Sequence, residues 1–236
     1  MTTGFSQSPK VVKGAFIELA EPFLGPVPSI IPFQYNPETV TRTMTPWAPP
    51  QGADGEEPET DGLSQPYDPE ETFSKMELIL DATDGLEDPA NYPMAPVSGV
   101  ADRIAAIEKL MFPVSTGALG GLGDALGGLL GASAAVSRKR APLVLFTWGL
   151  GRILPVRITD YQIAEQAFAP NLYPWRATIT VSLKVLTPEA LEASVEEGLA
   201  RDIAVTAYRY THTQKEVLAR AGFLTSIDSV FGILPF

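Results

Sequence analysis

The chain has 236 residues, 45% of them hydrophobic, and its 28 acidic against 17 basic side chains give a formal net charge of −11. It contains no Cys and a single His, which excludes disulfides, Cys or multi-His zinc sites and a Cys nucleophile. The acidic balance argues against nucleic-acid binding, because non-specific binding needs clustered Lys and Arg.

The start of the chain carries no recognisable targeting signal. Residues 1–13 lack the basic start and the apolar run of a secretory leader. Together with the absence of Cys, this predicts a cytoplasmic location. Strands are expected at residues 13–19 and 39–44, and Pro32 is expected at a strand start or edge because proline cannot donate to the ladder.

An acidic, proline-rich segment follows the second of these strands. Residues 54–71 contain eight acidic side chains and no Lys or Arg, and residues 46–69 contain six prolines. A segment so poor in apolar side chains cannot offset its ordering entropy, so we expect an exposed loop. A docking arm for a basic partner and a plain solvated insertion both fit this pattern.

The middle of the chain predicts a strand, a helix and a glycine-rich insert. Residues 75–80 alternate as a strand, and residues 98–111 place Val100, Ile104, Ile107 and Met111 on one helical face. Residues 116–136 then contain seven glycines among Ala and Leu. We expect a loop or a small-residue helix packed on another protein surface, since Asp124 and the absence of aromatic belts oppose a membrane span.

Three more strands are predicted in the next part of the chain. Residues 143–148 and 157–163 are strand candidates, with Pro155 expected at a strand start or edge. Residues 175–185 alternate apolar and polar side chains over eleven positions, which predicts a long strand with one buried face.

The C-terminal part changes to a helical period. Thr187 and Pro188 predict the start of a helix that runs to about residue 199. A second helix is expected over residues 202–221 with Gly222 as its cap. The apolar residues 223–236 must pack on their own domain or on a partner.

The sequence carries no enzyme signature. Asp160 and Glu165 lie near predicted strand ends, but nothing distinguishes them from surface acids. His212 is expected at the surface, since no Cys or second His accompanies it. No phosphate-binding glycine loop is present.

Several segments resemble one known family. Residues 31–39 (IPFQYNPET) are similar to the Phe-x-Phe-Asn-Pro signature near the start of contractile injection system tube proteins, which belong to phage-tail-like particles. Residues 143–149 (LVLFTWG) resemble that family's apolar strand ending in Trp-Gly, residues 151–161 the strand after it, and residues 175–185 its closing strand.

The resemblance implies a fold. We expect a mainly β protein with helices (α+β), a phage tube-like β-sandwich or barrel with one internal helix. Residues 1–186 would form the tube-like β domain, with inserts at about 46–71 and 116–138, and residues 187–236 a helical C-terminal extension. Many family members end in a LysM module, and this chain has no clear copy.

The resemblance also implies a role. Such members form six-fold rings at the baseplate junction between the spike hub and the inner tube, and have no catalytic residues. The implied partners are further copies (a hexamer), the spike hub, the inner tube and baseplate proteins, in a particle that can be released. No cofactor, metal, nucleic acid or stable membrane insertion is expected.

The residues that carry the family motifs are expected to support this assembly. Asn36 and Pro37 predict a tight turn, with Phe33, Tyr35 and Trp148 as core residues that orient the sheet. The polar face of residues 175–185 would line the channel. The full set is Phe33, Tyr35, Asn36, Pro37, Trp148, Gly149, Trp175, Ile179, Val181 and Leu183.

Two other readings of the sequence remain. A membrane-active protein would use residues 117–136, with the basic residues 138–140 as its flank. A carboxylate-based hydrolase of the cell wall is the less favoured alternative.

Overall fold

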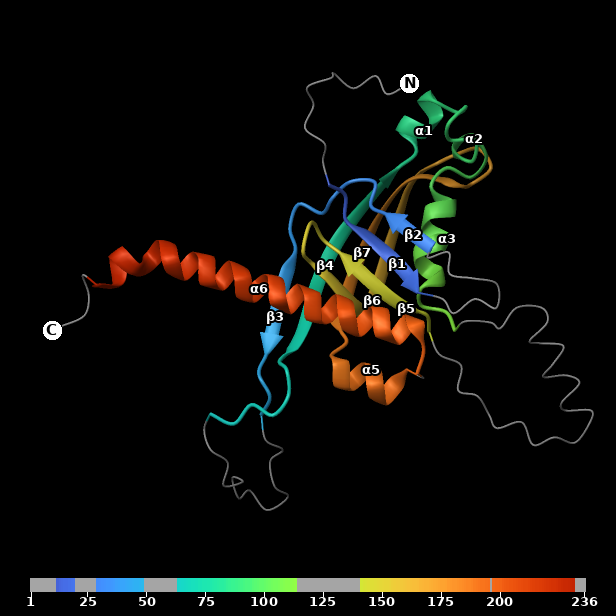
Figure 1. The fold of residues 1–236 in the computed structure, drawn as a ribbon. Coiled ribbons are helices and arrows are strands. Elements are labelled where there is room, and N and C mark those ends of the chain that lie inside the picture. The colour runs from blue at the N-terminus through green and yellow to red at the C-terminus, as the bar shows by residue number, and fades with distance from the viewer. Residues whose placement is uncertain (1–11, 20–28, 49–62, 114–140, 196, 232–236) are drawn as a thin grey trace, which may run out of the picture.

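The structure is a computed structural model that describes residues 12–19, 29–48, 63–113, 141–195 and 197–231. A seven-stranded sheet with the order β2-β1-β5-β6-β7-β4-β3 forms its centre (Figure 1). All neighbouring strands are antiparallel. The strands are β1 (Ala15–Leu19), β2 (Ser29–Pro32), β3 (Thr41–Thr45), β4 (Glu70–Asp81), β5 (Leu143–Thr147), β6 (Ile153–Phe168) and β7 (Pro174–Val185).

The sheet is strongly curled. The rings of Phe73 in β4 and Phe146 in β5 pack edge to face with centroids 5.2 Å apart, although β6 and β7 lie between these strands. In a flat sheet, three strand spacings would separate them by about 14 Å. The sheet therefore bends around its core as a partly closed barrel. The predicted α+β class is confirmed. The prediction named a β-sandwich or a barrel, and the single curled sheet corresponds to the barrel.

The core lies on the concave face of the sheet, and β7 shows why. Ile179, Val181 and Leu183 are fully buried, while Thr180 and Ser182 between them point to the other face and stay partly exposed. This is the alternation that the sequence predicts. However, β7 is a central strand, paired with β6 on one side and β4 on the other. It therefore cannot itself be an edge that extends into a neighbour.

Within the described residues, three short helices follow β4: α1 (Thr83–Glu87), α2 (Ala95–Ser98) and α3 (Ala101–Lys109). The prediction of one internal helix is therefore wrong in number, although Val100, Ile104 and Ile107 are buried as expected. The predicted helix is interrupted at Gly99, which has φ of +58°. A Cβ there would lie 2.2 Å from the carbonyl oxygen of Pro174, so the close approach of the β6–β7 turn requires glycine.

Two helices form the C-terminal extension, α5 (Pro188–Ser194) and α6 (Leu199–Phe231). Thr187 caps α5 as predicted, because its hydroxyl oxygen accepts a 3.3 Å hydrogen bond from the Ala190 N–H. The prediction that α5 reaches residue 199 is wrong, and so is the predicted end of α6 at Gly222. Nothing lies within 4 Å of a Cβ built at Gly222, so this glycine sits inside a helix at a cost of about 1 kcal/mol against alanine.

The first half of α6 packs on the sheet and the second half does not. Ala204, Tyr208 and Thr211 are buried, and Ala204 shares a small core with Leu145 of β5 and Leu191 of α5. Further along, α6 runs past the edge of the sheet (Figure 1), and Leu218 and Phe223 are exposed. The extension thus begins as part of the β domain's core and ends as a projecting helix.

The two inserts fall mostly outside the described residues. This applies to the whole glycine-rich segment and to residues 49–62 of the acidic one. Where the acidic segment is described, its end is not a solvated loop: Glu70 and Glu71 begin β4, and Glu71 is buried. The two prolines lie as expected, since Pro32 ends the edge strand β2 and Pro155 is the third residue of β6.

Candidate assembly surfaces

The sheet presents free strand edges. β3 lies at one end of the strand order and, among the described residues, pairs with β4 alone; all five of its residues are exposed. β6 pairs with β5 only over residues 153–156, so among the described strands its residues 157–168 pair with β7 alone. Unpaired backbone N–H and C=O groups along such edges are ready templates for another strand.

These two edges bound a sheet of four strands, β6, β7, β4 and β3. Each strand is antiparallel to the next, so β6 and β3 at the two ends run in opposite directions. If β3 of one copy meets β6 of the next copy in the same orientation, the contact is again antiparallel. An even number of strands in each copy is what a rotational ring of antiparallel strands requires.

The convex face of this four-stranded sheet is mostly polar, and its charges nearly balance. Its register places Gln162, Thr180 and Glu77 in one row across the strands. The next row is Ala164, Thr178 and Ile79. Ion pairs neutralise charges at both ends of the face, because Lys184 contacts Glu70 at 2.9 Å and Arg176 contacts Asp81 at 2.7 Å.

Asp81 is held ionised by its neighbours at one end of this face. Burial alone would raise the pKa of its carboxyl. Hydrogen bonds from Thr83 and Arg176 outweigh burial and bring the pKa below its ordinary value. The Arg176–Asp81 contact therefore stays charged and paired at neutral pH.

The signature around Asn36 is a tether and not the predicted tight turn. The Asn36 side-chain oxygen accepts from the Gly14 N–H at 2.9 Å, and its amide donates to the Val12 carbonyl at 2.9 Å. Asn36 thereby fixes the start of β1 to the segment between β2 and β3. Phe33 is buried as predicted. Tyr35, predicted as core, is 43% exposed, and its hydroxyl contacts Asp84 at 3.3 Å, because the backbone bends between the two aromatic side chains.

The Trp-Gly segment ends β5 in a turn. Trp148 is half-buried and its ring stacks on Phe146 with centroids 6.2 Å apart, and its backbone N–H donates to the Arg152 carbonyl. Gly149 has φ of +83°, which favours glycine. Pro37 lines a surface cavity beside Lys75 and Glu77. Of the predicted residues in β7, Ile179, Val181 and Leu183 are core residues, whereas Trp175 is 40% exposed.

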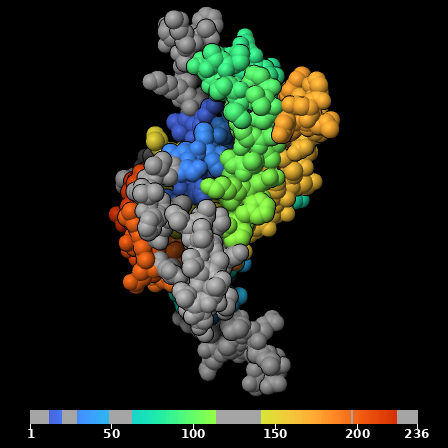
Figure 2. All heavy atoms as spheres, turned by 90° about the vertical axis from the view of Figure 1, so that its right-hand side faces the viewer, coloured from blue at the N-terminus to red at the C-terminus, as the bar shows by residue number. Residues whose placement is uncertain are grey.

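Trp175 belongs to an exposed apolar end of the molecule. The turn between β6 and β7 and the helices around α2 lie side by side there (Figure 2), and the Asn171 amide donates to the Val97 carbonyl at 3.0 Å. The exposed apolar side chains at this end are Tyr92, Met94, Val97, Phe168, Leu172, Tyr173 and Trp175.

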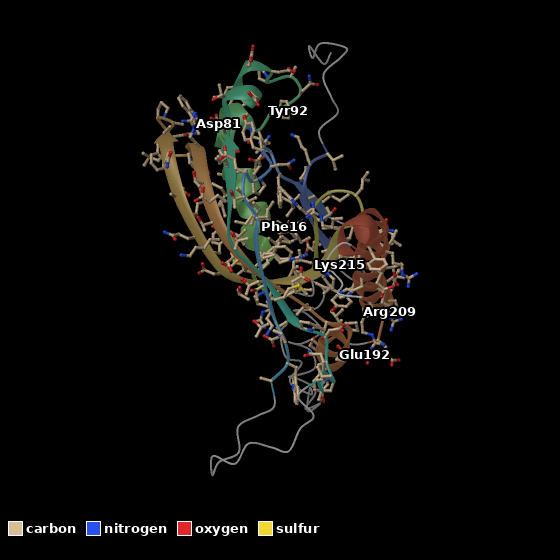
Figure 3. The ribbon with its side chains drawn as sticks, turned by 90° about the vertical axis from the view of Figure 1, so that its left-hand side faces the viewer. Phe16, Asp81, Tyr92, Glu192, Arg209 and Lys215 are labelled. Atoms are coloured by element: carbon tan, nitrogen blue, oxygen red, sulfur yellow. The ribbon has the colours of Figure 1, made fainter. Side chains whose placement is uncertain are left out.

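A buried carboxylate that we did not predict joins α6 to the sheet. Glu71 is 3% exposed and lies 3.0 Å from the Lys215 ammonium of α6 and 3.4 Å from the Arg42 guanidinium of β3. Figure 3 shows Lys215 on the side of α6 that faces the sheet. The signal was present in the sequence, because Glu71 shares the alternation of Phe73 and falls on the buried face of β4.

The side chains considered for catalysis do not converge. Asp160 pairs with Ser182 on the convex face, while Glu165 pairs with Ala177 on the concave side. The two carboxylates therefore cannot act as a pair. No metal-binding cluster of three or more His, Asp or Glu side chains occurs among the described residues. His212 is not a free surface side chain as predicted: it stacks on Tyr208 at 4.4 Å, and burial, with Lys215, lowers its pKa.

The structure also bears on the alternative that the protein is membrane-active. Within the described residues, every helix is too short or too polar to span a bilayer. The segment on which that reading depends, residues 117–136, lies outside the described residues.

A comparison with known proteins identifies a family whose match covers the motif segments and the four-stranded sheet. No curated protein matches the chain significantly. The family described as contractile injection system tube protein matches residues 21–194, a range that contains Asn36, the Trp148 turn and all of the four-stranded sheet. The chain therefore belongs to the contractile injection system tube protein family and is a structural subunit of such a particle.

Proposed function

We propose that copies of this chain close into a ring at the baseplate that connects the spike hub to the inner tube, with six copies in the ring. Membership of the tube family supports assembly into a multi-subunit particle. The particle would assemble in the cytoplasm of the producing cell.

The observation that carries the proposal is the pair of free edges on the four-stranded sheet. The edge strand β3 of one copy pairs with residues 157–168 of β6 in the next copy, and this contact repeats around the ring. The interface is head-to-tail, with a different surface on each side, which is the kind that closes into a ring when the rotation fits. Each copy then adds four strands to one continuous barrel.

In this ring the convex face of the sheet lines the channel. Thr178 and Thr180 stand in its middle, and the paired charges Arg176–Asp81 lie near one rim. A surface of hydroxyl and amide groups with balanced charge offers few strong contacts to a passing molecule. The apolar end around Trp175 lies at one axial face of the ring, where the hub or the tube would stack.

The proposal can be tested by disulfide mapping, because the chain has no Cys of its own. A double variant would carry cysteines at Thr43 in β3 and at Gln162 in β6, and variants at Asp160 and Ala164 would cover neighbouring registers. Co-expression with hub and tube proteins supplies a template for closure. Oxidation should then give a ladder of linked chains that ends at six.

A matched control replaces the β6 cysteine with one at Thr180, which is on the same face but in the central strand β7. This pair should give no ladder. If none of the β3–β6 pairs links within assembled particles, the proposed edge contact is wrong. A ladder ending at another number would keep the contact and replace the hexamer.

A further inference from the structure

The free stretch of β6 has two irregularities that limit where another strand can pair with it. The register with β7 shifts between Ile158 and Asp160, and Ala167 has φ of +53°. A regular ladder needs extended backbone on both strands, so residues 160–166 are the part that can receive a strand without interruption. β3 has five residues, Thr41–Thr45, and therefore fits inside this part.

The faces of the sheet restrict the alignment further. In β3, Arg42 pairs with the buried Phe73 of β4, and the next residue but one, Met44, pairs with the buried Glu71. Arg42 and Met44 therefore belong to the concave face, and the threonines of β3 belong to the convex face. Directly opposed residues of neighbouring strands share a face. Arg42 and Met44 of one copy must accordingly meet concave residues of β6 in the next copy.

Two antiparallel alignments satisfy both conditions. Within residues 160–166, the concave side chains of β6 are those that pair with fully buried residues of β7, namely Tyr161, Ile163 and Glu165. In the first alignment, Arg42 opposes Glu165 and Met44 opposes Ile163. In the second, each lies two residues earlier on β6, so Arg42 opposes Ile163 and Met44 opposes Tyr161.

The receiving edge is acidic on its concave side. Glu165 is exposed, and neither it nor Glu108 of α3 forms an ion pair with another described residue. Both carboxylates lie near Tyr161: burial, followed by the negative charges of Glu108 and Glu165, raises the pKa of the Tyr161 hydroxyl to about 12. Figure 2 shows α3 beside this stretch of β6. The edge therefore offers two carboxylates to a cationic side chain.

The edge of β3 is basic on the same face. Glu71 is one carboxylate between two cations, Arg42 and Lys215, so one positive charge is in excess beside β3. The Arg42 side chain is 41% exposed, and its guanidinium has five N–H donors, more than one carboxylate can accept. The two edges thus carry opposite charges on the face where they would meet.

The first alignment brings opposite charges together and apolar side chains together, whereas the second sets the Arg42 guanidinium against Ile163. We propose that Arg42 of one copy pairs with Glu165 of the next copy, and that this pair fixes the register in which β3 joins β6. The inference rests on the proposed ring and adds to it the residues that select one alignment of the two edges.

Cysteine pairs test the alignment in particles co-expressed with hub and tube proteins. The proposed register places Thr43 opposite Ala164. Directly opposed Cβ atoms lie about 5 Å apart and diagonal ones about 7 Å, so cysteines at Thr43 and Ala164 should link about fivefold faster than cysteines at Thr43 and Gln162. Faster linking of the Gln162 pair overturns the register and leaves the ring contact standing. Linking by none of these pairs overturns both.

Charge reversal tests the ion pair itself. Glu165→Arg removes the attraction and opposes two cations, so the fraction of subunits found in rings at limiting concentration should fall by about fivefold or more. Adding Arg42→Glu to the same chain restores opposite charges and should recover most of this loss. Asp160→Arg is the matched control, because Asp160 is exposed on the same strand but on the convex face. It should assemble like the wild type.

The thermal unfolding of each purified variant shows whether the subunit still folds. If Arg42→Glu unfolds it, Glu165→Gln takes its place: this variant should assemble less well than the wild type at low salt, and the difference should vanish near about 1 M salt. Equal assembly of Glu165→Arg and Asp160→Arg overturns the proposal. So does a deficit of Glu165→Gln that salt leaves unchanged.

Discussion

The hydroxyl of Tyr208 donates a 2.9 Å hydrogen bond to the carboxylate of Asp68, which precedes Tyr208 by 140 residues. Burial, and then this bond to an anionic acceptor, raises the pKa of the Tyr208 hydroxyl. One helical turn further on, the hydroxyl of Thr211 donates to the Ile153 carbonyl at 2.6 Å and accepts from its N–H at 2.9 Å. The first half of α6 is therefore bound into the barrel by specific polar contacts.

Two truncations should behave differently. A chain that ends after Val185 loses Leu191, Ala204 and Tyr208, which exposes Leu145 of β5. We expect it to aggregate or to melt early. A chain that ends after Glu216 keeps all of these contacts and should unfold at nearly the wild-type temperature. Calorimetry of both chains checks this, and equal stability of the two would show that α6 is not part of the core.

Adjacent glutamates in β4 should differ in their effect on stability. Glu71→Ala leaves Lys215 and Arg42 without their partner and opens a gap on the buried face, so we expect a loss of about 1–3 kcal/mol. Glu70→Ala removes an exposed pair with Lys184 and should cost less than about 1 kcal/mol. Urea unfolding of both variants measures the difference, and similar values would contradict the role assigned to Glu71.

Asn36→Ala should destabilise the start of β1. The substitution removes both hydrogen bonds to the backbone at Val12 and Gly14, so we expect a loss of about 1–3 kcal/mol. Asn91→Ala is a suitable control, because Asn91 is exposed and bonds only to the nearby Asp88 among its described contacts. Hydrogen exchange should show faster opening of β1 in the first variant alone.

Substitutions on the two faces of β7 should differ strongly in their effect on the free energy of unfolding. Ile179→Ala leaves a cavity in the core and should cost about 2–5 kcal/mol of unfolding free energy. Thr180→Ala lies on the convex face and should change it by no more than about 0.5 kcal/mol. Guanidinium unfolding compares them, and a large effect of Thr180→Ala would show that the convex face is packed within the subunit.

His212 should make stability depend on pH. Burial and Lys215 lower its pKa in the folded chain, whereas the unfolded chain has the ordinary value of about 6.5. As the pH falls below about 6.5, the unfolded state takes up a proton first, so the folded state loses stability until the folded pKa is passed. His212→Phe keeps a ring against Tyr208 and should flatten this part of the curve. The free energy of unfolding of both proteins is measured from pH 7.5 to 5. If it falls equally in the wild type and in His212→Phe, His212 does not contribute to the pH dependence.

The sequence predicted those elements whose pattern is set by one buried face. The alternation around Ile179 and Val181 predicted the strand and its inward side, and the apolar spacing of Ile104 and Ile107 predicted α3. These patterns depend on local period alone. They do not contain the strand order, so the position of β7 between β4 and β6 could not be predicted from them.

Misplaced or missed features depend on contacts between distant parts of the chain. Asn36 was assigned to a turn because the Asn-Pro pair favours turns locally, whereas its side chain bonds to backbone 22 and 24 residues away. Gly222 was expected to end α6, but the helix continues to Phe231. Glu71 was assigned to a solvated loop from its acidic neighbours, and its buried position became clear only once Lys215 and Arg42 were placed beside it.

The free stretch of β6 poses a hazard to an unassembled subunit, because a long open edge can recruit the same edge of any other molecule. Two irregularities oppose this. The register with β7 shifts between Ile158 and Asp160, and Ala167 has φ of +53°. A bulge and a kink of this kind prevent two such edges from lying flat against each other, while the charges of Arg157 and Asp160 discourage stacking into fibrils. The subunit is in this sense protected against amyloid-like growth, and its edge accepts a strand that is shaped to match it.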